Sequence, residues 1–284
     1  MSTPGKRRLI VNRVVVAIDA STEQLRTLEA AADLAALMQA ELHGLFVRDP
    51  NLMRLEKLPG TRKIELPQGF GGQIKEGSIR REVEAMARRV EQLIARASEQ
   101  RHINWSFHSV EGVIDSELTS RCGEGDLLVT ESAGRSIRSG MRMKPQTRRA
   151  PDELERPVLY LQGGPRQTRS IVAVYDGGPD SEAVLDAAVR LFGGPVSLLT
   201  VLLAADSREE ADELREEAES RLSQDAVPAH YRRISPDSTE WILHAIDAVH
   251  GDILIQGAGS ESLEEEGALE SLLEALDCPM LLIR

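Results

Sequence analysis

Aromatic side chains are scarce in this chain of 284 residues, in which Phe, Trp and Tyr together make up 3%. The cores must therefore be built from Leu, Val, Ile and Ala, and hydrophobic residues at 41% supply enough for sizeable ones. Only two cysteines occur, Cys122 and Cys278, which indicates a reducing compartment and no disulfide framework. No apolar run approaches the roughly 18 residues of a membrane span, and the basic start lacks a small-residue cleavage site. We therefore expect a cytoplasmic protein that binds no membrane.

Negative charge is concentrated in one half of the chain. Residues 1–163 carry a balance of +3, whereas residues 164–284 carry 9 Lys and Arg against 24 Asp and Glu, a balance of −15. An acidic half of this size argues against a nucleic-acid clamp across the molecule. The asymmetry also predicts that the two halves differ in what their surfaces bind.

The two halves repeat one order of strands and helices. Each begins with an apolar strand that ends in an acid, Asp19 or Asp176, and each has a long charged helix before its third strand, at 78–100 and 207–223. Each closes with a strand led by proline. The expected strands are 13–19, 41–47, 104–110, 125–131 and 157–162 in the first half, and 170–176, 196–203, 229–235, 251–257 and 279–284 in the second.

Apolar strands that alternate with helices are typical of a parallel sheet covered by helices on both faces. Each half is therefore predicted to be a doubly wound α/β domain with a five-stranded parallel sheet. The Gly/Pro linker 163–168 places the domains at 1–164 and 165–284. A single sheet of about ten strands is the alternative, which we favour less because the strand order restarts so cleanly.

Several short motifs, in the same order in both halves, carry a family resemblance. The strand–Asp–turn–helix opening, the segments GDLLVTESAGRS (125–136) and GDILIQGAGS (251–260), and the closing strands together resemble two tandem copies of the universal stress protein family. The resemblance implies an adenine-nucleotide-hydrolase-like fold and a stress-response role, often without catalysis. Some members of that family bind ATP or related nucleotides, and others do not.

The closing strands of single-domain members meet across a two-fold dimer axis. The resemblance therefore implies an intramolecular pseudo-dimer of the two repeats in this chain. Apolar edge strands also favour such pairing on physical grounds. We expect the closing strands to face one another through Val158, Leu159 and Leu161 on one side and Met280, Leu282 and Ile283 on the other.

The nucleotide-binding members share a glycine signature after the fourth strand: Gly, two residues, Gly, nine residues, Gly, then Ser or Thr. Glycines let backbone N–H groups approach phosphates closely, and a helix start adds a positive dipole end. In the first copy Gly134 matches, but Glu131 stands at the first position and Lys144-Pro145 at the last. A carboxylate there repels phosphate, and proline removes a backbone donor.

The second copy departs from the signature less. Gly257 matches the first position, whereas the second falls on Ser260, next to Gly259. The third falls on Glu270-Ser271, or on Gly267-Ala268 if the loop is shortened. Neither copy carries an intact phosphate cradle, and ordinary turn chemistry after a strand also explains these glycines.

The acids that end the first strands complete the candidate sites. In nucleotide-binding members the equivalent acid lies beside the adenosine moiety, although Asp19 and Asp176 can equally cap a helix or bind turn amides. The candidate adenine-nucleotide residues are Asp176, Gly177, Gly257, Gly259 and Gly267 in the second half, and Asp19 and Gly134 in the first. We expect any nucleotide, ATP being the first candidate, to bind the second half.

Two segments are specific to this chain. Residues 135–149 carry six Lys and Arg and no acid, which suits phosphate, an acidic partner or a solvated loop. Residues 48–77 form a long insertion with apolar side chains, which we expect to pack on something, the other repeat being one candidate.

One motif supports a rival function. DGGPDS (176–181) differs from the Ser-Gly-Gly-x-Asp-Ser loop of ATP pyrophosphatases only in Asp176 for Ser, but the acid opposes the charge of the leaving group. The histidines and cysteines show no metal-ligand spacing, so no metal cofactor is expected. The sequence therefore favours a non-catalytic tandem universal stress protein with at most a degenerate nucleotide site. The alternatives are an ATP-using enzyme of the same superfamily and a scaffold whose acidic half binds a protein partner.

Overall fold

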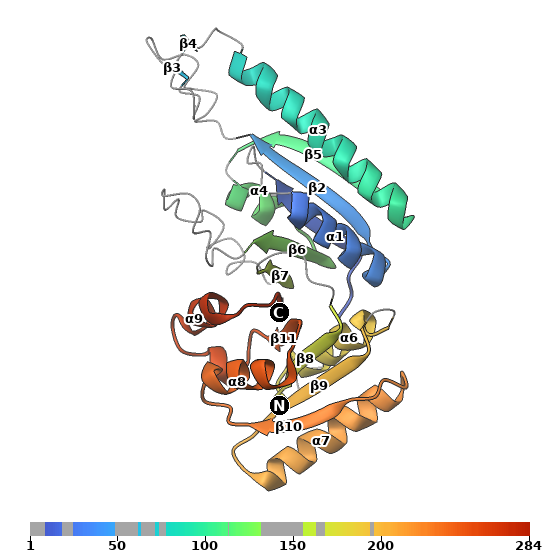
Figure 1. The fold of residues 1–284 in the computed structure, drawn as a ribbon, viewed down its shortest axis with the longest axis vertical. Coiled ribbons are helices and arrows are strands. Elements are labelled where there is room, and N and C mark those ends of the chain that lie inside the picture. The colour runs from blue at the N-terminus through green and yellow to red at the C-terminus, as the bar shows by residue number, and fades with distance from the viewer. Residues whose placement is uncertain are drawn as a thin grey trace.

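One β-sheet of ten strands runs through the molecule (Figure 1). The computed structural model describes residues 9–18, 25–48, 62–63, 72–73, 78–112, 114–131, 156–162, 168–193 and 196–284. The strand order is β10-β9-β8-β11-β12-β7-β6-β1-β2-β5. In the first half the strands are β1 (Arg13–Ile18), β2 (Glu41–Arg48), β5 (Trp105–Glu111), β6 (Asp126–Glu131) and β7 (Val158–Leu161). In the second half they are β8 (Ser170–Tyr175), β9 (Leu198–Ala204), β10 (His230–Ile234), β11 (Ile253–Gly257) and β12 (Met280–Ile283).

Within each half the strands pair in parallel and in the same relative order, which confirms the predicted α/β architecture. The predicted strand positions agree with the observed ones to within about two residues at each end. Near-continuous apolar runs made this possible, because strands buried on both faces carry them. In β8 every residue is buried.

Helices cover both faces of the sheet, and equivalent helices of the two halves lie on the same face (Figure 1). One apolar core packs under α1 (Leu25–Met38), α3 (Ser78–Arg101), α6 (Ser181–Leu191) and α7 (Arg208–Ser223). The other packs under α4 (Ile114–Arg121), α8 (Thr239–Val249) and α9 (Ala268–Ala275). Both cores continue across the junction between the halves.

The two halves join edge to edge through β7 and β12, which pair antiparallel. Met280 lies opposite Tyr160, Leu281 opposite Leu159, and Leu282 opposite Val158. The expected meeting of the closing strands is therefore confirmed. The expectation of two separate sheets is corrected, because this ladder merges two five-stranded sets into the ten-stranded sheet that had been the less favoured alternative.

The faces of the two closing strands alternate, which corrects a detail of the expected contact. Val158, Met280 and Leu282 belong to one core, whereas Leu159 and Ile283 belong to the other, with Leu161 packed against it. Successive side chains of a strand point to opposite faces, so the six residues cannot form one contact surface.

The antiparallel junction also determines at which edge of the sheet the carboxyl ends of each half lie. All strands of one half run opposite to those of the other, so their carboxyl ends lie at opposite edges of the sheet. In the insertion 48–77, beyond Arg48 at the end of β2, the structure describes only β3 (Arg62–Lys63) and β4 (Gly72–Gln73), which pair antiparallel. The expected packing of its apolar side chains lies outside the described residues.

Candidate functional site

The carboxyl ends of β8 and β11 meet where the strand order of the second half reverses, since β9 lies on one side of this pair and β12 on the other. Ligands of open α/β sheets bind in the crevice at such a point. Asp176 directly follows β8, Gly257 ends β11, and Gly259 lies two residues beyond it. The structure thus brings three of the predicted site residues to one edge of the sheet.

Asp176 binds the turn that follows it. Its Oδ1 accepts the Gly178 N–H at 2.9 Å and the Ser181 hydroxyl at 2.6 Å. The Asp176 N–H in turn points to the Ser181 hydroxyl oxygen at 3.4 Å. Gly177 adopts a φ of +73°, which a side chain rarely tolerates. Asp176 therefore binds the turn and the start of α6, which is one of the roles that the sequence left open for it.

Asp180 is the residue that links this turn to the glycines of the second loop. Its Oδ2 accepts the Gly259 N–H at 3.1 Å. A Cβ on Gly257 would lie 2.8 Å from the Asp180 Cβ, closer than real Cβ contacts allow. Glycine is therefore required at 257 by the approach of the α6 start. No sequence pattern distinguishes Asp180 as a site residue, although the segment DGGPDS contains it.

The loop after β11 carries acids throughout. It runs through a short 3-10 helix, η2 (Glu261–Leu263), to Gly267, which directly precedes α9 with a φ of +86°. Gly267 therefore lies at a helix start, where the third glycine of the family signature would stand if the loop were shortened. No Lys or Arg occurs from Gly257 to Ile283. The exposed acids of the loop and of the first turn of α9 are Glu261, Glu264, Glu265, Glu266 and Glu270.

The candidate residues of the first half, Asp19 and Gly134, lie outside the described residues, as does the basic segment 135–149. Glu131, the acid at the first signature position, is the last residue of β6. The geometry of a site in this half is therefore not described.

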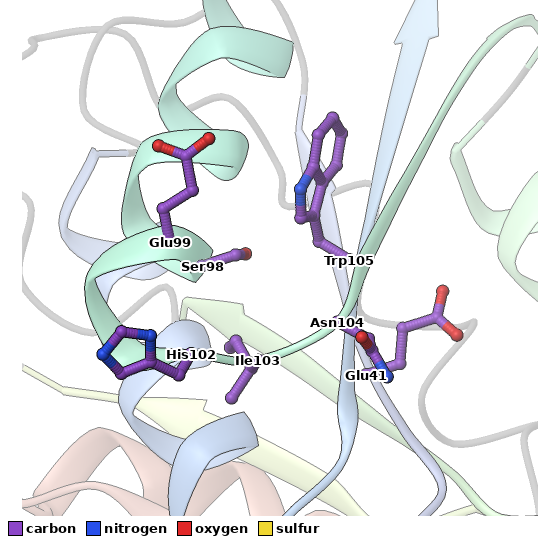
Figure 2. Close-up of a pocket in the computed structure, with 7 residues that line it drawn as sticks. All are labelled: Glu41, Ser98, Glu99, His102, Ile103, Asn104 and Trp105. Carbon is purple, nitrogen blue, oxygen red and sulfur yellow. The ribbon is translucent and has the colours of Figure 1, made fainter.

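A hollow of about 650 Å³ lies elsewhere, between the end of α3 and the start of β5 (Figure 2). Its lining includes Glu41, Glu99, His102 and Trp105, and Trp105 is 38% exposed. Figure 2 shows Glu41 and Glu99 directed away from each other. The hollow lies at the amino ends of β2 and β5, so it is not the crevice at the carboxyl ends of the strands.

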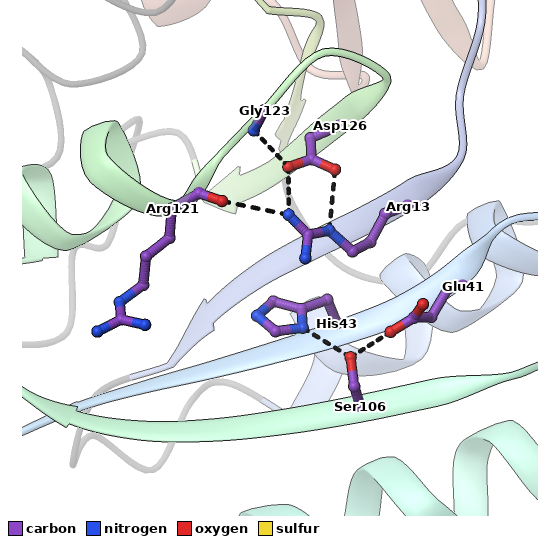
Figure 3. A network of polar contacts seen from close by, with 7 residues as sticks. All are labelled: Arg13, Glu41, His43, Ser106, Arg121, Gly123 and Asp126. Carbon is purple, nitrogen blue, oxygen red and sulfur yellow. Dashed lines mark hydrogen bonds and ion pairs between the residues drawn. The ribbon is translucent and has the colours of Figure 1, made fainter.

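A partly buried polar network connects β2 to β5 near that edge (Figure 3). Ser106 donates its hydroxyl proton to Glu41 and contacts His43 Nδ1 at 2.8 Å. His43 is therefore the donor to Ser106 and does not activate this hydroxyl as a nucleophile. Burial lowers the pKa of His43 to about 4, with smaller contributions from Arg13 and His108.

Arg13 and Asp126 form the second part of the network, at the amino ends of β1 and β6. The guanidinium donates from Nε to Oδ1 at 2.9 Å and from Nη2 to Oδ2 at 2.6 Å. Asp126 Oδ2 also accepts the Gly123 N–H at 2.7 Å. The bidentate pair raises the pKa of Arg13, chiefly through its hydrogen bond to Asp126, and fixes strand ends.

Among the described residues no group of three His, Cys, Asp or Glu side chains is arranged to hold a metal ion. Within that same part of the chain, no helix has the length and apolar character needed to cross a membrane.

Comparison with known proteins identifies relatives for both sequence and fold. The sequence model of the universal stress protein family matches residues 11–160. A crystal structure of a universal stress protein from Archaeoglobus fulgidus DSM 4304 aligns with a TM-score of 0.66 at 15% identity, covering 98% of this chain and 97% of that one. A functionally unknown protein from Pseudomonas aeruginosa PAO1 aligns with a TM-score of 0.56 at 14% identity, covering 96% and 92%. No curated protein sequence matches the chain.

Proposed function

Because the chain belongs to the universal stress protein family, we propose that it is a tandem member that acts in stress response by binding a ligand and not by catalysis. We assign its two domains to residues 1–164 and 165–284. The repeated strand order supports the second domain, as does a fold likeness that extends over nearly the whole chain. Neither Cys122 nor Cys278 is part of a disulfide, which suits a cytoplasmic location.

We assign the ligand site to the second half, with an adenine nucleoside or nucleotide as the ligand class. Asp176, Gly177, Gly257 and Gly259 form its inner part and Gly267 its outer part. One observation carries the assignment: the glycines after β11 reach the start of α6 at the point where the strand order reverses. We regard this site as degenerate because acids surround it and the family's glycine spacing is broken.

The competing function is an ATP-using enzyme built on the DGGPDS loop. Such a loop holds pyrophosphate through its backbone amides, but here the Gly178 N–H is donated to Asp176. A carboxylate that already holds the turn repels pyrophosphate. It therefore opposes both the binding of pyrophosphate and the build-up of negative charge on it as a leaving group. This contact favours binding without turnover.

Calorimetric titration with adenosine and with ATP tests the site. A Gly257→Glu variant should lose binding, because its side chain cannot fit against Asp180. Gly123→Glu is the matched control: a Cβ there meets nothing within 4 Å, and the residue lies in the other half, three residues before β6.

Unchanged affinity in Gly257→Glu would contradict the site. Conversion of ATP to AMP by the wild-type protein would favour the enzyme. No binding by the wild type would favour a scaffold whose acidic half binds a protein partner.

A further inference from the structure

We propose that Asp180 makes the site of the second half select a nucleoside over a nucleotide, because its carboxylate occupies the place that a phosphate would need. The inference rests on the proposed function and names its ligand class more narrowly. It assigns a specificity role to a residue outside the glycine signature.

The Asp180 carboxylate lies where a phosphate would bind. Backbone N–H groups after the fourth strand are the donors that a phosphate would use in this fold, and the Gly259 N–H already donates to Asp180 Oδ2 at 3.1 Å. The same oxygen lies 3.4 Å from the place where a Gly259 Cβ would be. Asp180 thus fills the space that the small residues of the loop leave open. A phosphate would have to displace an anion that is tethered to the chain.

Hydrogen bonds hold the backbone around Asp180 in place. Asp180 directly precedes α6, and its backbone C=O accepts the Val184 N–H at 2.9 Å. One residue later, Ser181 hydrogen-bonds Asp176 at 2.6 Å, which ties the start of α6 to the end of β8. Asp180 caps no amide of its own helix with its side chain. Its carboxylate is instead directed across to the loop after β11.

Charge is the second argument. Asp176 and Asp180 bring two carboxylates to the start of α6, and every charged side chain from Gly257 to the first turn of α9 is acidic. The repulsion between these carboxylates and a triphosphate is not offset by any Lys or Arg between Gly257 and Ile283. An uncharged nucleoside does not meet this repulsion, so adenosine is the form of ligand that the second half can admit.

Titrations with adenosine, ATP and inorganic pyrophosphate, on the full chain and its variants, test the proposal. Asp180→Asn removes the charge and keeps the shape, and Asp180→Ala also opens the space. We expect the wild type to bind adenosine at least tenfold more tightly than ATP. Both variants should bind ATP at least tenfold more tightly than the wild type does, with adenosine affinity changed less than threefold. Asp180→Ala should also bind pyrophosphate, which the wild type should not.

An exposed acid beyond β10, Asp237, provides the matched control, since Asp237→Asn removes the same charge two strands away from β8. Circular dichroism and thermal unfolding verify that each variant is folded. If the wild type prefers ATP, or if neither variant gains affinity for ATP, the role of Asp180 is overturned while the adenine site stands. If no adenine ligand binds any variant but Asp180→Ala gains pyrophosphate, the proposed function fails and the role of Asp180 stands. Failure of every titration overturns both.

Discussion

His43 is a buried histidine whose surroundings oppose its charged form. Its exposed fraction is 5%, and its pKa is lowered to about 4 from an ordinary 6.5. His43 therefore binds protons more strongly in the unfolded chain than in the folded one. The contribution of the neutral imidazole to the free energy of unfolding is complete above about pH 6.5 and is lost as the pH falls toward 4. Over that range we expect His43 to reduce the free energy of unfolding by about 3 kcal/mol.

Denaturant titrations at a series of pH values measure this loss. His43→Gln keeps a donor for Ser106 but does not titrate, so its free energy of unfolding should fall less between pH 6.5 and 4. His230→Gln, an exposed histidine of β10, is the control and should behave as the wild type does. Equal acid dependence in wild type and His43→Gln would show that the imidazole is freely protonated in the folded protein.

At the residue scale, sequence identified positions better than roles. Asp176 follows an apolar strand, and this pattern does not distinguish ligand binding from turn binding. Only the structure shows its contacts to Gly178 and Ser181. The acid of the segment GDILIQGAGS, Asp252, accepts the N–H groups of Arg169 and Ser170, which is a structural role at the amino end of a strand. Asp180 lay in a quoted motif, but its partner is 79 residues away in sequence, and no local pattern encodes that distance.

The contact between α6 and α7 includes one buried ion pair. Arg221 binds Asp186, whose side chain is 7% exposed, and Asp186 Oδ2 also accepts the Leu9 N–H at 3.3 Å. Removing one partner of a buried pair leaves the other charge uncompensated. We expect Asp186→Ala to lower the free energy of unfolding by about 3 kcal/mol, measured by chemical denaturation.

The exposed pair Arg215–Glu219 on the same helix provides the comparison, with side chains 54% and 44% exposed. Glu219→Ala should lower the free energy of unfolding far less than Asp186→Ala does, because exposed pairs are screened and solvated. Similar losses in both variants would mean that Asp225, the second partner of Arg221, compensates for the loss of Asp186.

At the scale of elements, prediction from sequence succeeded where periodicity was strong. The long helices α3 and α7 follow from apolar residues at spacings of three and four, and the buried residues of α7 are Ala211, Leu214, Ala218 and Leu222, as that spacing requires. The ladder of β3 and β4 was not predicted. Strands of two residues carry no alternation that a sequence pattern can reveal.

Sequence predicted the pairing of the halves but not its register. The apolar closing strands indicated a sheet edge that needs a partner strand, and the family resemblance indicated a two-fold axis between them. The faces of Val158 and Leu159 were not separable in advance, because an apolar strand buried on both sides lacks the alternation that distinguishes them.

The whole molecule should hold together when its chain is cut. If a protease site is introduced at 163–167 and cleaved, β7 and β12 should keep the fragments paired, since Val158, Leu159, Met280 and Leu282 are all at most 4% exposed. A buried apolar side chain contributes about 1.5–3 kcal/mol. Sedimentation velocity should show one species with the mass of the intact chain. Two separate monomers of the expected fragment masses would show that the junction is weak.

The junction of β7 with β12 has a consequence for how the two halves can change. In a dimer of identical chains every substitution appears twice, so two sites related by symmetry must remain alike. Here the two partners of the junction belong to one chain, and each half can be altered alone. The balances of +3 and −15 illustrate the freedom this gives, because two copies of the acidic half would double its self-repulsion, whereas the near-neutral half does not add to it. Covalent continuity thus lets one half become acidic while the other keeps a basic segment.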